Sequence, residues 1–149
     1  MISRFVENIP TPNLLLGLAG LIPFWVLAFI GVFADASLSE IALKTQIAYG
    51  AVILSFLGGI HWGMAIKNLE EATWLRMSWG ITLPLIGWGS LFISTIYALI
   101  LLGLSLFVSL IVDLQFTIPN KEYSWFRVLR IILSAGAISA LFFVILFIS

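Results

Sequence analysis

The residues of this chain best suited to chemistry are a histidine and an aspartate that lie inside long apolar segments. His61 is the only histidine, and it stands a few residues before the end of the apolar stretch 45–66. Asp113 is the only acid inside a predicted membrane-crossing segment. An ionisable group within a membrane is costly and therefore suggests either a functional site or a paired contact. A histidine there can transfer protons or bind a metal, or it can donate one hydrogen bond that braces neighbouring helices.

Three arginines are expected close to this pair. The segments that carry His61 and Asp113 end at the same predicted membrane face, and Arg76, Arg127 and Arg130 open the neighbouring segments from that face. A carboxylate at the membrane edge needs a cationic or amide partner, so we expect Asp113 to pair with Arg127 or Arg130. Such a cluster either fastens the helices to one another or uses its arginines to bind an anionic lipid or a small anion.

A row of small side chains marks the same segment as His61. Ala51, Ser55, Gly59 and Gly63 recur at every fourth position, which places them on one face of a helix. Small residues allow two helix backbones to approach closely in a membrane, where van der Waals contact replaces the hydrophobic driving force. We expect this ridge to pack within the chain, with a homodimer interface as the alternative. His61 points away from the ridge.

The rest of the sequence contains no recognisable catalytic or cofactor motif. There is no cysteine, which excludes disulfides, thiol chemistry and iron–sulfur clusters. A lone histidine makes a poor metal site, so we expect no metal and no cofactor. The net charge is zero, which argues against a nucleic-acid partner. The neighbouring acids Glu70 and Glu71 lie in a polar loop and are expected to be solvated, and no phosphate-binding or dinucleotide fingerprint is present.

The composition of the chain requires a lipid environment. Hydrophobic residues make up 62% of the sequence and charged residues only 9%, with a mean hydropathy of +1.17. A soluble domain carries roughly 25% charged residues. The sequence predicts one all-α membrane domain over residues 1–149, a helical bundle of about five transmembrane helices. The predicted spans lie at about residues 13–33, 45–66, 77–94, 97–115 and 127–148.

The basic residues set the expected orientation of these spans. Cytoplasmic loops carry an excess of lysine and arginine, so the N-terminus is expected inside and the C-terminus outside. Lys44 stands on the outer side, while the other six share the inner face: Arg4, Lys67, Arg76, Lys121, Arg127 and Arg130. In the alternative, the chain crosses four times, the region 77–115 is partly re-entrant and the C-terminus is inside.

Local signals predict where the first two helices begin and bend. Asn13 can cap the first helix, and Pro23 near its centre predicts a kink. Ser37 and Glu40 have the spacing of a capping box, which predicts that the second helix opens there.

Three parts of the sequence resemble a known family. The stretches 16–24 (LGLAGLIPF), 49–63 (YGAVILSFLGGIHWG) and 125–130 (WFRVLR), together with Asp113, are similar to domain-of-unknown-function family three-four-two-nine. That family includes bacterial inner-membrane proteins and the animal proteins called transmembrane protein sixty-nine. The resemblance implies a small polytopic helical protein of a bacterial inner membrane or, alternatively, a mitochondrial inner membrane. It implies no activity, but it places His61 within the most specific shared block.

We therefore expect a structural, assembly or interaction role with lipids or other membrane proteins, and enzymatic activity is less expected. The partners would be the lipid bilayer, an anionic lipid, other membrane proteins or a second copy of the chain. The alternative is a small transporter or channel subunit, with a polar path along Tyr49, Ser55, His61 and Asp113. A third interpretation is an intramembrane enzyme that uses His61 and Asp113 as an acid–base pair. Neither the substrate nor the oligomeric state is readable from the sequence.

Overall fold

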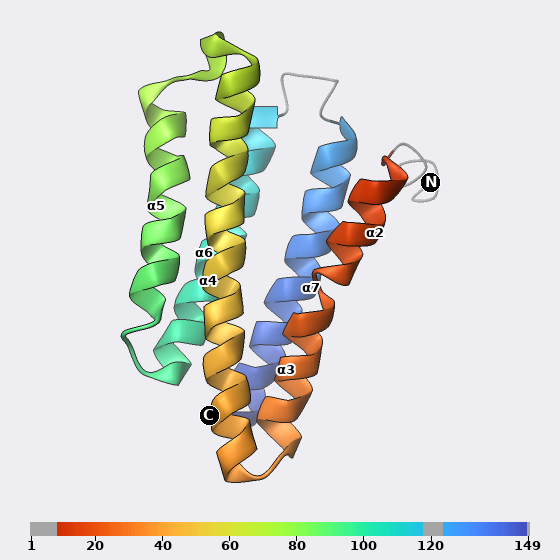
Figure 1. The fold of residues 1–149 in the computed structure, drawn as a ribbon, viewed down its shortest axis with the longest axis vertical. Helices are drawn as coiled ribbons and strands as arrows, with labels where there is room; N and C mark the ends of the chain where they lie inside the picture. The colour runs from red at the N-terminus through yellow and green to blue at the C-terminus, as the bar shows by residue number, and fades with distance from the viewer. Residues whose placement is uncertain (1–8, 118–123, 149) are drawn as a thin grey trace.

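The computed structural model describes residues 9–117 and 124–148, which form a bundle of antiparallel helices without a strand (Figure 1). The prediction of an all-α membrane bundle is confirmed. The elements are α2 (Thr11–Ala19), α3 (Ile22–Phe33), α4 (Ala36–Lys67), the short 3-10 helix η1 (Leu69–Glu71), α5 (Trp74–Ser90), α6 (Thr95–Thr117) and α7 (Ser124–Ile148). Helices α2 and α3 follow one another as two parts of the first rod.

The first rod is broken at Gly20, where α2 ends and α3 soon begins. Pro23 lies in the first turn of α3, where its missing N–H costs nothing, so the predicted bend is present and falls just before the proline. A break inside a membrane is tolerated when neighbouring side chains bind the freed backbone groups. Tyr49 of α4 donates its hydroxyl to the Gly20 carbonyl at 2.8 Å. Gln46 donates its amide to the Phe24 carbonyl at 3.1 Å.

Two predicted helix starts are wrong. α2 begins at Thr11, after Pro10, and Asn13 provides no cap because it already lies inside the helix. α4 begins at Ala36, and its cap is Asp35, whose carboxylate accepts the backbone N–H groups of Ser37 and Leu38 at 3.1 and 3.2 Å. An ionised carboxylate is at least as good a cap as a serine hydroxyl and is favoured at the positive end of the helix.

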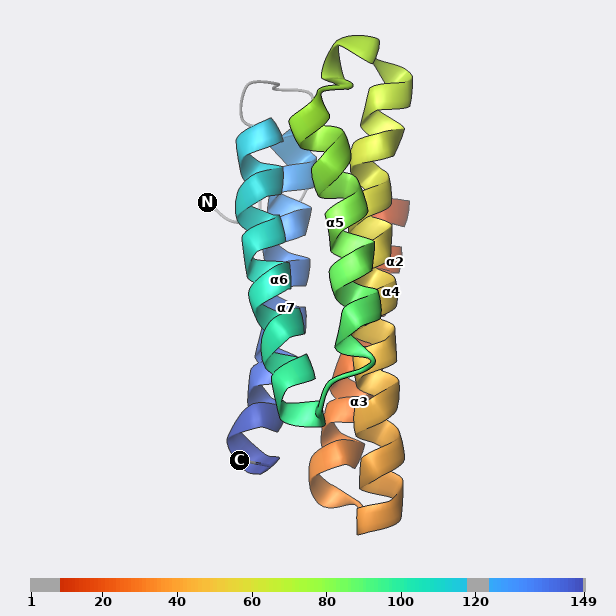
Figure 2. The same ribbon diagram turned by 90° about the vertical axis from the view of Figure 1, so that its left-hand side faces the viewer.

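Four of the five rods are long and apolar enough to cross a membrane. They are the broken first rod, α4, α6 and α7. α5 has 17 residues and is about 25 Å long, a little less than the roughly 30 Å apolar core of a bilayer. It packs against α4 and α6 and leads the chain back from the end of α4 to the start of α6 (Figure 2). α2 starts at the end of the bundle where α7 also starts, and α7 finishes at the opposite end (Figure 1).

The closest helix contact joins α4 to α5, and it differs from the predicted small-residue ridge. A Cβ atom added to Gly58 would lie 2.2 Å from the Gly80 carbonyl oxygen, and one added to Gly87 would lie 2.9 Å from the Ala51 carbonyl oxygen. A Cβ atom added to Gly59 would meet no atom within 4 Å.

Of the four residues of the predicted ridge, only Ala51 is buried against another helix. Ser55, Gly59 and Gly63 are exposed, and a Cβ atom at Gly63 also meets nothing. The expectation that this ridge packs within the chain is therefore wrong at three positions. The spacing was right for one helix face, but the face that meets α5 is rotated by about one residue, through Gly58.

The outer surface is apolar, as a lipid-facing surface must be. Large hydrophobic side chains stand exposed on every rod; Phe29, Phe56, Trp88, Phe107 and Phe142 are each at least half exposed. Soluble monomers rarely expose contiguous apolar surface on this scale. The interior is filled by leucines from α4, α5 and α6 and by Phe24 and small alanines from α3 and α7.

Candidate functional site

The carboxylate of Asp113 lies at the centre of a buried polar cluster that joins three helices. Its Oδ2 accepts a hydrogen bond of 2.6 Å from Nε of Arg130 on α7. Its Oδ1 lies 2.9 Å from Nε2 of His61 on α4. All three residues are at most 4% exposed. Of the two arginines considered as partners, Arg130 makes the contact.

Two serines complete the cluster. Nη1 of Arg130 donates to the Ser134 hydroxyl at 3.2 Å, and Nη2 donates to the Ser109 hydroxyl at 3.3 Å. We call these five residues, Asp113, His61, Arg130, Ser109 and Ser134, the Asp113 cluster. The sequence interpretation missed both serines. The signal was present, because Ser109 stands four residues before Asp113 and Ser134 four residues after Arg130, and that spacing places each pair on one helix face.

The His61 ring is buried between Asp113 and Phe116. Its Nε2 faces Asp113, and Phe116 meets the ring edge-on with 5.7 Å between centroids. Both ring nitrogens are buried, and neither makes a hydrogen bond of good geometry with a described residue. Leu54 and Leu57 of the same helix are buried with it.

The other two predicted arginines bind elsewhere. Arg76 is buried and pairs with Glu71, while its Nη2 contacts the sulfur of Met64 at 3.4 Å and its guanidinium lies 4.8 Å from the centre of the Phe116 ring. The expectation that Glu71 is simply solvated is therefore wrong: it fastens η1 to the start of α5.

Arg127 lies one turn before Arg130 and reaches the end of α6. Its Nη1 donates to the Thr117 carbonyl at 2.7 Å, and carbonyls in the last turn of a helix lack a partner within that helix. Arg76 and Arg127 thus flank the Asp113 cluster without contacting its carboxylate through any hydrogen bond or ion pair between described residues. We refer to the end of the bundle that carries Lys67, Arg76, Arg127 and Arg130 as the basic end.

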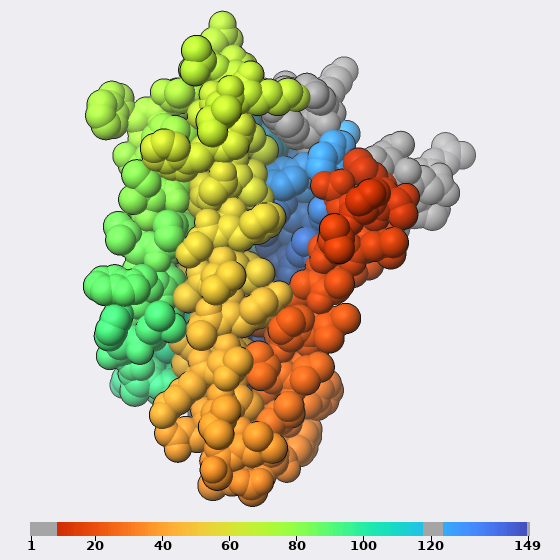
Figure 3. Space-filling model, in the orientation of Figure 1, coloured from red at the N-terminus to blue at the C-terminus, as the bar shows by residue number. Residues whose placement is uncertain are grey.

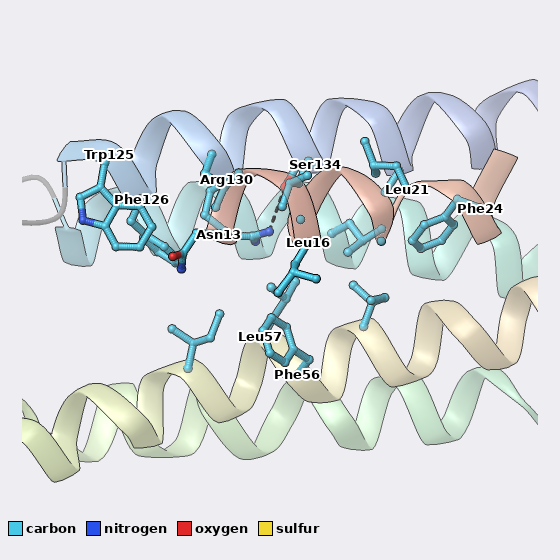
Figure 4. Close-up of a pocket in the computed structure, with 18 of the residues that line it drawn as sticks. Asn13, Leu16, Leu21, Phe24, Phe56, Leu57, Trp125, Phe126, Arg130 and Ser134 are labelled. Atoms are coloured by element: carbon cyan, nitrogen blue, oxygen red, sulfur yellow. Dashed lines mark hydrogen bonds between the residues drawn. The ribbon is translucent and has the colours of Figure 1, made fainter. Parts of the chain in front are cut away.

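A cavity of about 670 Å³ opens beside the Asp113 cluster, between α2, α4 and α7. We call it the lateral cavity. In the space-filling view the surface is hollowed between α4 and α2, and α7 is visible at the base of the hollow (Figure 3). Figure 4 shows that it runs along the helices, from Trp125 at the basic end to Phe24 deeper in the bundle.

The walls of the lateral cavity are apolar, with a few polar groups on one side. Leu16, Phe56 and Leu57 line the walls that face each other across it (Figure 4). Arg130 and Ser134, joined by their hydrogen bond, belong to both the cavity wall and the Asp113 cluster. Asn13 and Trp125 stand nearer the basic end. The arrangement suits a long apolar molecule with a small polar group.

The described residues place the members of the alternative polar path apart. The Tyr49 hydroxyl binds the Gly20 carbonyl, and Ser55 is exposed and bonds to the carbonyl of Ala51 on its own helix. No group of three or more histidines or acids able to hold a metal ion occurs among the described residues.

Comparison with known proteins identifies the family. The family model described as "Protein of unknown function (DUF3429)" matches residues 9–146. The chain belongs to this family. Transmembrane protein 69 of Xenopus tropicalis is 36% identical over 144 residues, which cover 93% of this chain and 55% of that protein. Transmembrane protein 69 of Mus musculus is 32% identical over 132 residues, 86% of this chain and 53% of the relative.

The chain therefore spans about half the length of the curated relatives it matches. Its DUF3429 membership and the names of these relatives agree with the apolar bundle: this is a membrane-spanning protein. The family description assigns no activity. No solved structure matches the chain.

Proposed function

We propose that this DUF3429 protein binds a lipid inside its fold, with the apolar tail in the lateral cavity. The observation that carries the proposal is an apolar cavity of about 670 Å³ with Arg130 and Ser134 in its wall. Small-molecule sites commonly measure about 300–1,000 Å³ and combine apolar walls with a few polar groups, as this cavity does. The proposal specifies the interaction role that the sequence predicts.

The position of the cavity suits a guest that arrives from the bilayer. α2 and α4 form its two rims, and both carry exposed apolar side chains, such as Leu16 and Phe56. A lipid tail could slide between these rims without leaving an apolar environment. The polar groups lie toward the basic end, where the end of the bundle meets the head groups if the bundle spans a bilayer.

Recognition of a protein partner by the Asp113 cluster is less well supported. All five residues of the cluster are buried or nearly so, and therefore no protein surface could reach the carboxylate without separating the helices. A transport function has less support as well. Tyr49 bonds to the Gly20 carbonyl and Ser55 to the Ala51 carbonyl, so these two residues do not line a common polar path with His61.

We also propose that the basic end faces the cytoplasm of a bacterium, in the inner membrane, or the matrix if the protein is mitochondrial. Support comes from the charges: four of the described basic residues lie at that end, and Lys44 lies toward the other. The chain has no cysteine, so single cysteines report cleanly. L38C and L69C should be labelled from opposite sides by a membrane-impermeant thiol reagent. Labelling from one side contradicts the orientation.

The lipid-binding proposal is tested by narrowing the cavity. Ile53 and Val52 are neighbours on α4, but only Ile53 lines the cavity, and Val52 is 61% exposed on the outer surface. The protein is purified in a mild detergent, and retained lipid is counted by native mass spectrometry. I53W should lose most of the retained lipid, while V52W should keep it. Equal retention by both variants contradicts the proposal.

A further inference from the structure

We propose that the occupant of the lateral cavity is an uncharged lipid with ester or hydroxyl oxygens in its head, of the monoacylglycerol class. Arg130 and Ser134 bind those oxygens, and Asp113 keeps the site electrically neutral. This inference rests on the lipid-binding proposal above and adds the chemistry of the head group to it.

Arg130 and Ser134 have hydrogen-bond donors that their contacts within the cluster do not use. A guanidinium carries five N–H groups, and the contacts of Arg130 with Asp113, Ser134 and Ser109 use one on each of its three nitrogens. Nη1 and Nη2 therefore each keep a second N–H. Ser134 accepts from Arg130, so its own hydroxyl proton remains available to donate. These remaining donors of Arg130 and Ser134 suit acceptor oxygens.

The charge at the cavity wall is set by Arg130 and Asp113. The positive charge of Arg130 is balanced at 2.6 Å by the carboxylate of Asp113. This ion pair has no net charge. An anionic head group would bring an uncompensated negative charge beside a buried carboxylate, which costs free energy in a water-poor site. An uncharged oxygen acceptor meets the same donors without that cost.

The cavity also has uncharged polar groups at its rim. Asn13 and Trp125 line the cavity near the basic end (Figure 4). An amide and an indole present uncharged hydrogen-bonding groups, and tryptophan favours the head-group level of a bilayer. Arg130 is the only charged side chain among the described residues that line the cavity. The rim thus adds neutral partners, in agreement with a glycerol-type head.

The experiment compares two probes that share one tail, 1-monooleoylglycerol and oleyl sulfate, whose charge does not depend on pH. The delipidated full chain is offered both at equal concentration, and the retained molecules are counted by native mass spectrometry. We expect the natural sequence to retain the monoglyceride about tenfold better, because only the sulfate brings a negative charge beside the Asp113 carboxylate. D113N leaves the charge of Arg130 unbalanced and should reverse the preference toward the sulfate.

Two further variants keep the test decisive. In D113N/R130Q both charges are gone, and the preference for the sulfate should disappear. S134A removes one donor and acceptor and should weaken monoglyceride retention about fivefold. Thermal unfolding of each variant shows whether it is folded, and S134A, which removes a single hydroxyl, decides the question if D113N does not fold.

The outcomes separate the inference from the function on which it rests. Retention of neither probe by the natural sequence overturns the lipid-binding proposal and this inference with it. Retention of the sulfate as well as or better than the monoglyceride overturns only the inference. An unchanged preference in a folded D113N protein overturns the role given to Asp113. Unchanged retention of the monoglyceride by S134A overturns the role given to Ser134.

Discussion

Removing either partner of the Asp113–Arg130 pair should destabilise the bundle strongly, and removing both should not. Breaking a buried ion pair costs about 3–5 kcal/mol, because one charge is left without compensation. The two single variants should differ. In R130Q, Asp113 keeps the His61 ring at 2.9 Å as a polar neighbour, so we expect about 3 kcal/mol. In D113N, Arg130 keeps only neutral partners, the two serine hydroxyls and the new amide, so we expect about 5 kcal/mol.

The double variant D113N/R130Q places two neutral amides in the same space and should lie within about 1 kcal/mol of the natural sequence. The assay is unfolding in mixed detergent micelles by increasing dodecyl sulfate, followed by tryptophan fluorescence. The control is the Glu40–Lys44 pair, which has a comparable distance of 2.5 Å but is about two-thirds exposed. It should show no measurable coupling. Additive losses in the Asp113–Arg130 cycle, or a larger loss in R130Q than in D113N, would refute this reasoning.

Three further predictions concern the scaffold. G58A should destabilise the folded protein by about 1–3 kcal/mol, because its Cβ atom would lie 2.2 Å from the Gly80 carbonyl oxygen. G59A should be neutral or stabilising, because a Cβ atom there meets nothing. Equal unfolding midpoints of the two variants in detergent would contradict the α4–α5 contact. Y49F removes the bond to the carbonyl at the break of the first rod and should cost about 1 kcal/mol, measured in the same assay, with faster amide exchange in α2 as a second sign. D35A removes the cap of α4 and should cost about 1 kcal/mol, and D35S should recover most of it; loss without recovery by serine would argue against a capping role.

The sequence predicted those features that follow from hydropathy and charge alone. The apolar stretches predicted an all-α membrane bundle. The sequence also predicted a cationic partner for Asp113, because a carboxylate in an apolar segment must be paired. Between Arg127 and Arg130 the sequence could not choose. The choice depends on the depth and rotation of α7, which packing against α6 and α3 sets.

The features that the sequence did not predict depend on rotation of helices about their axes. The ridge through Gly59 and the face through Gly58 differ by one residue, about 100° of rotation, and both are plausible from spacing. Ser109 and Ser134 were missed because a serine in a membrane helix commonly bonds to its own backbone, as Ser105 does here. The lateral cavity arises from the separation of α2 from α4 after the break at Gly20, and no local pattern encodes its volume.

The central claim is that a lipid tail enters the bundle between α2 and α4, and photolabelling tests it most directly. A monoacylglycerol with a diazirine in its tail is added to membranes that contain the protein, and the labelled residues are located by peptide mass spectrometry. We expect label on the cavity-lining residues Leu57 and Leu133, in competition with unlabelled monoglyceride. Label confined to outward-facing positions such as Val52 and Phe107, unaffected by the competitor, would contradict the account.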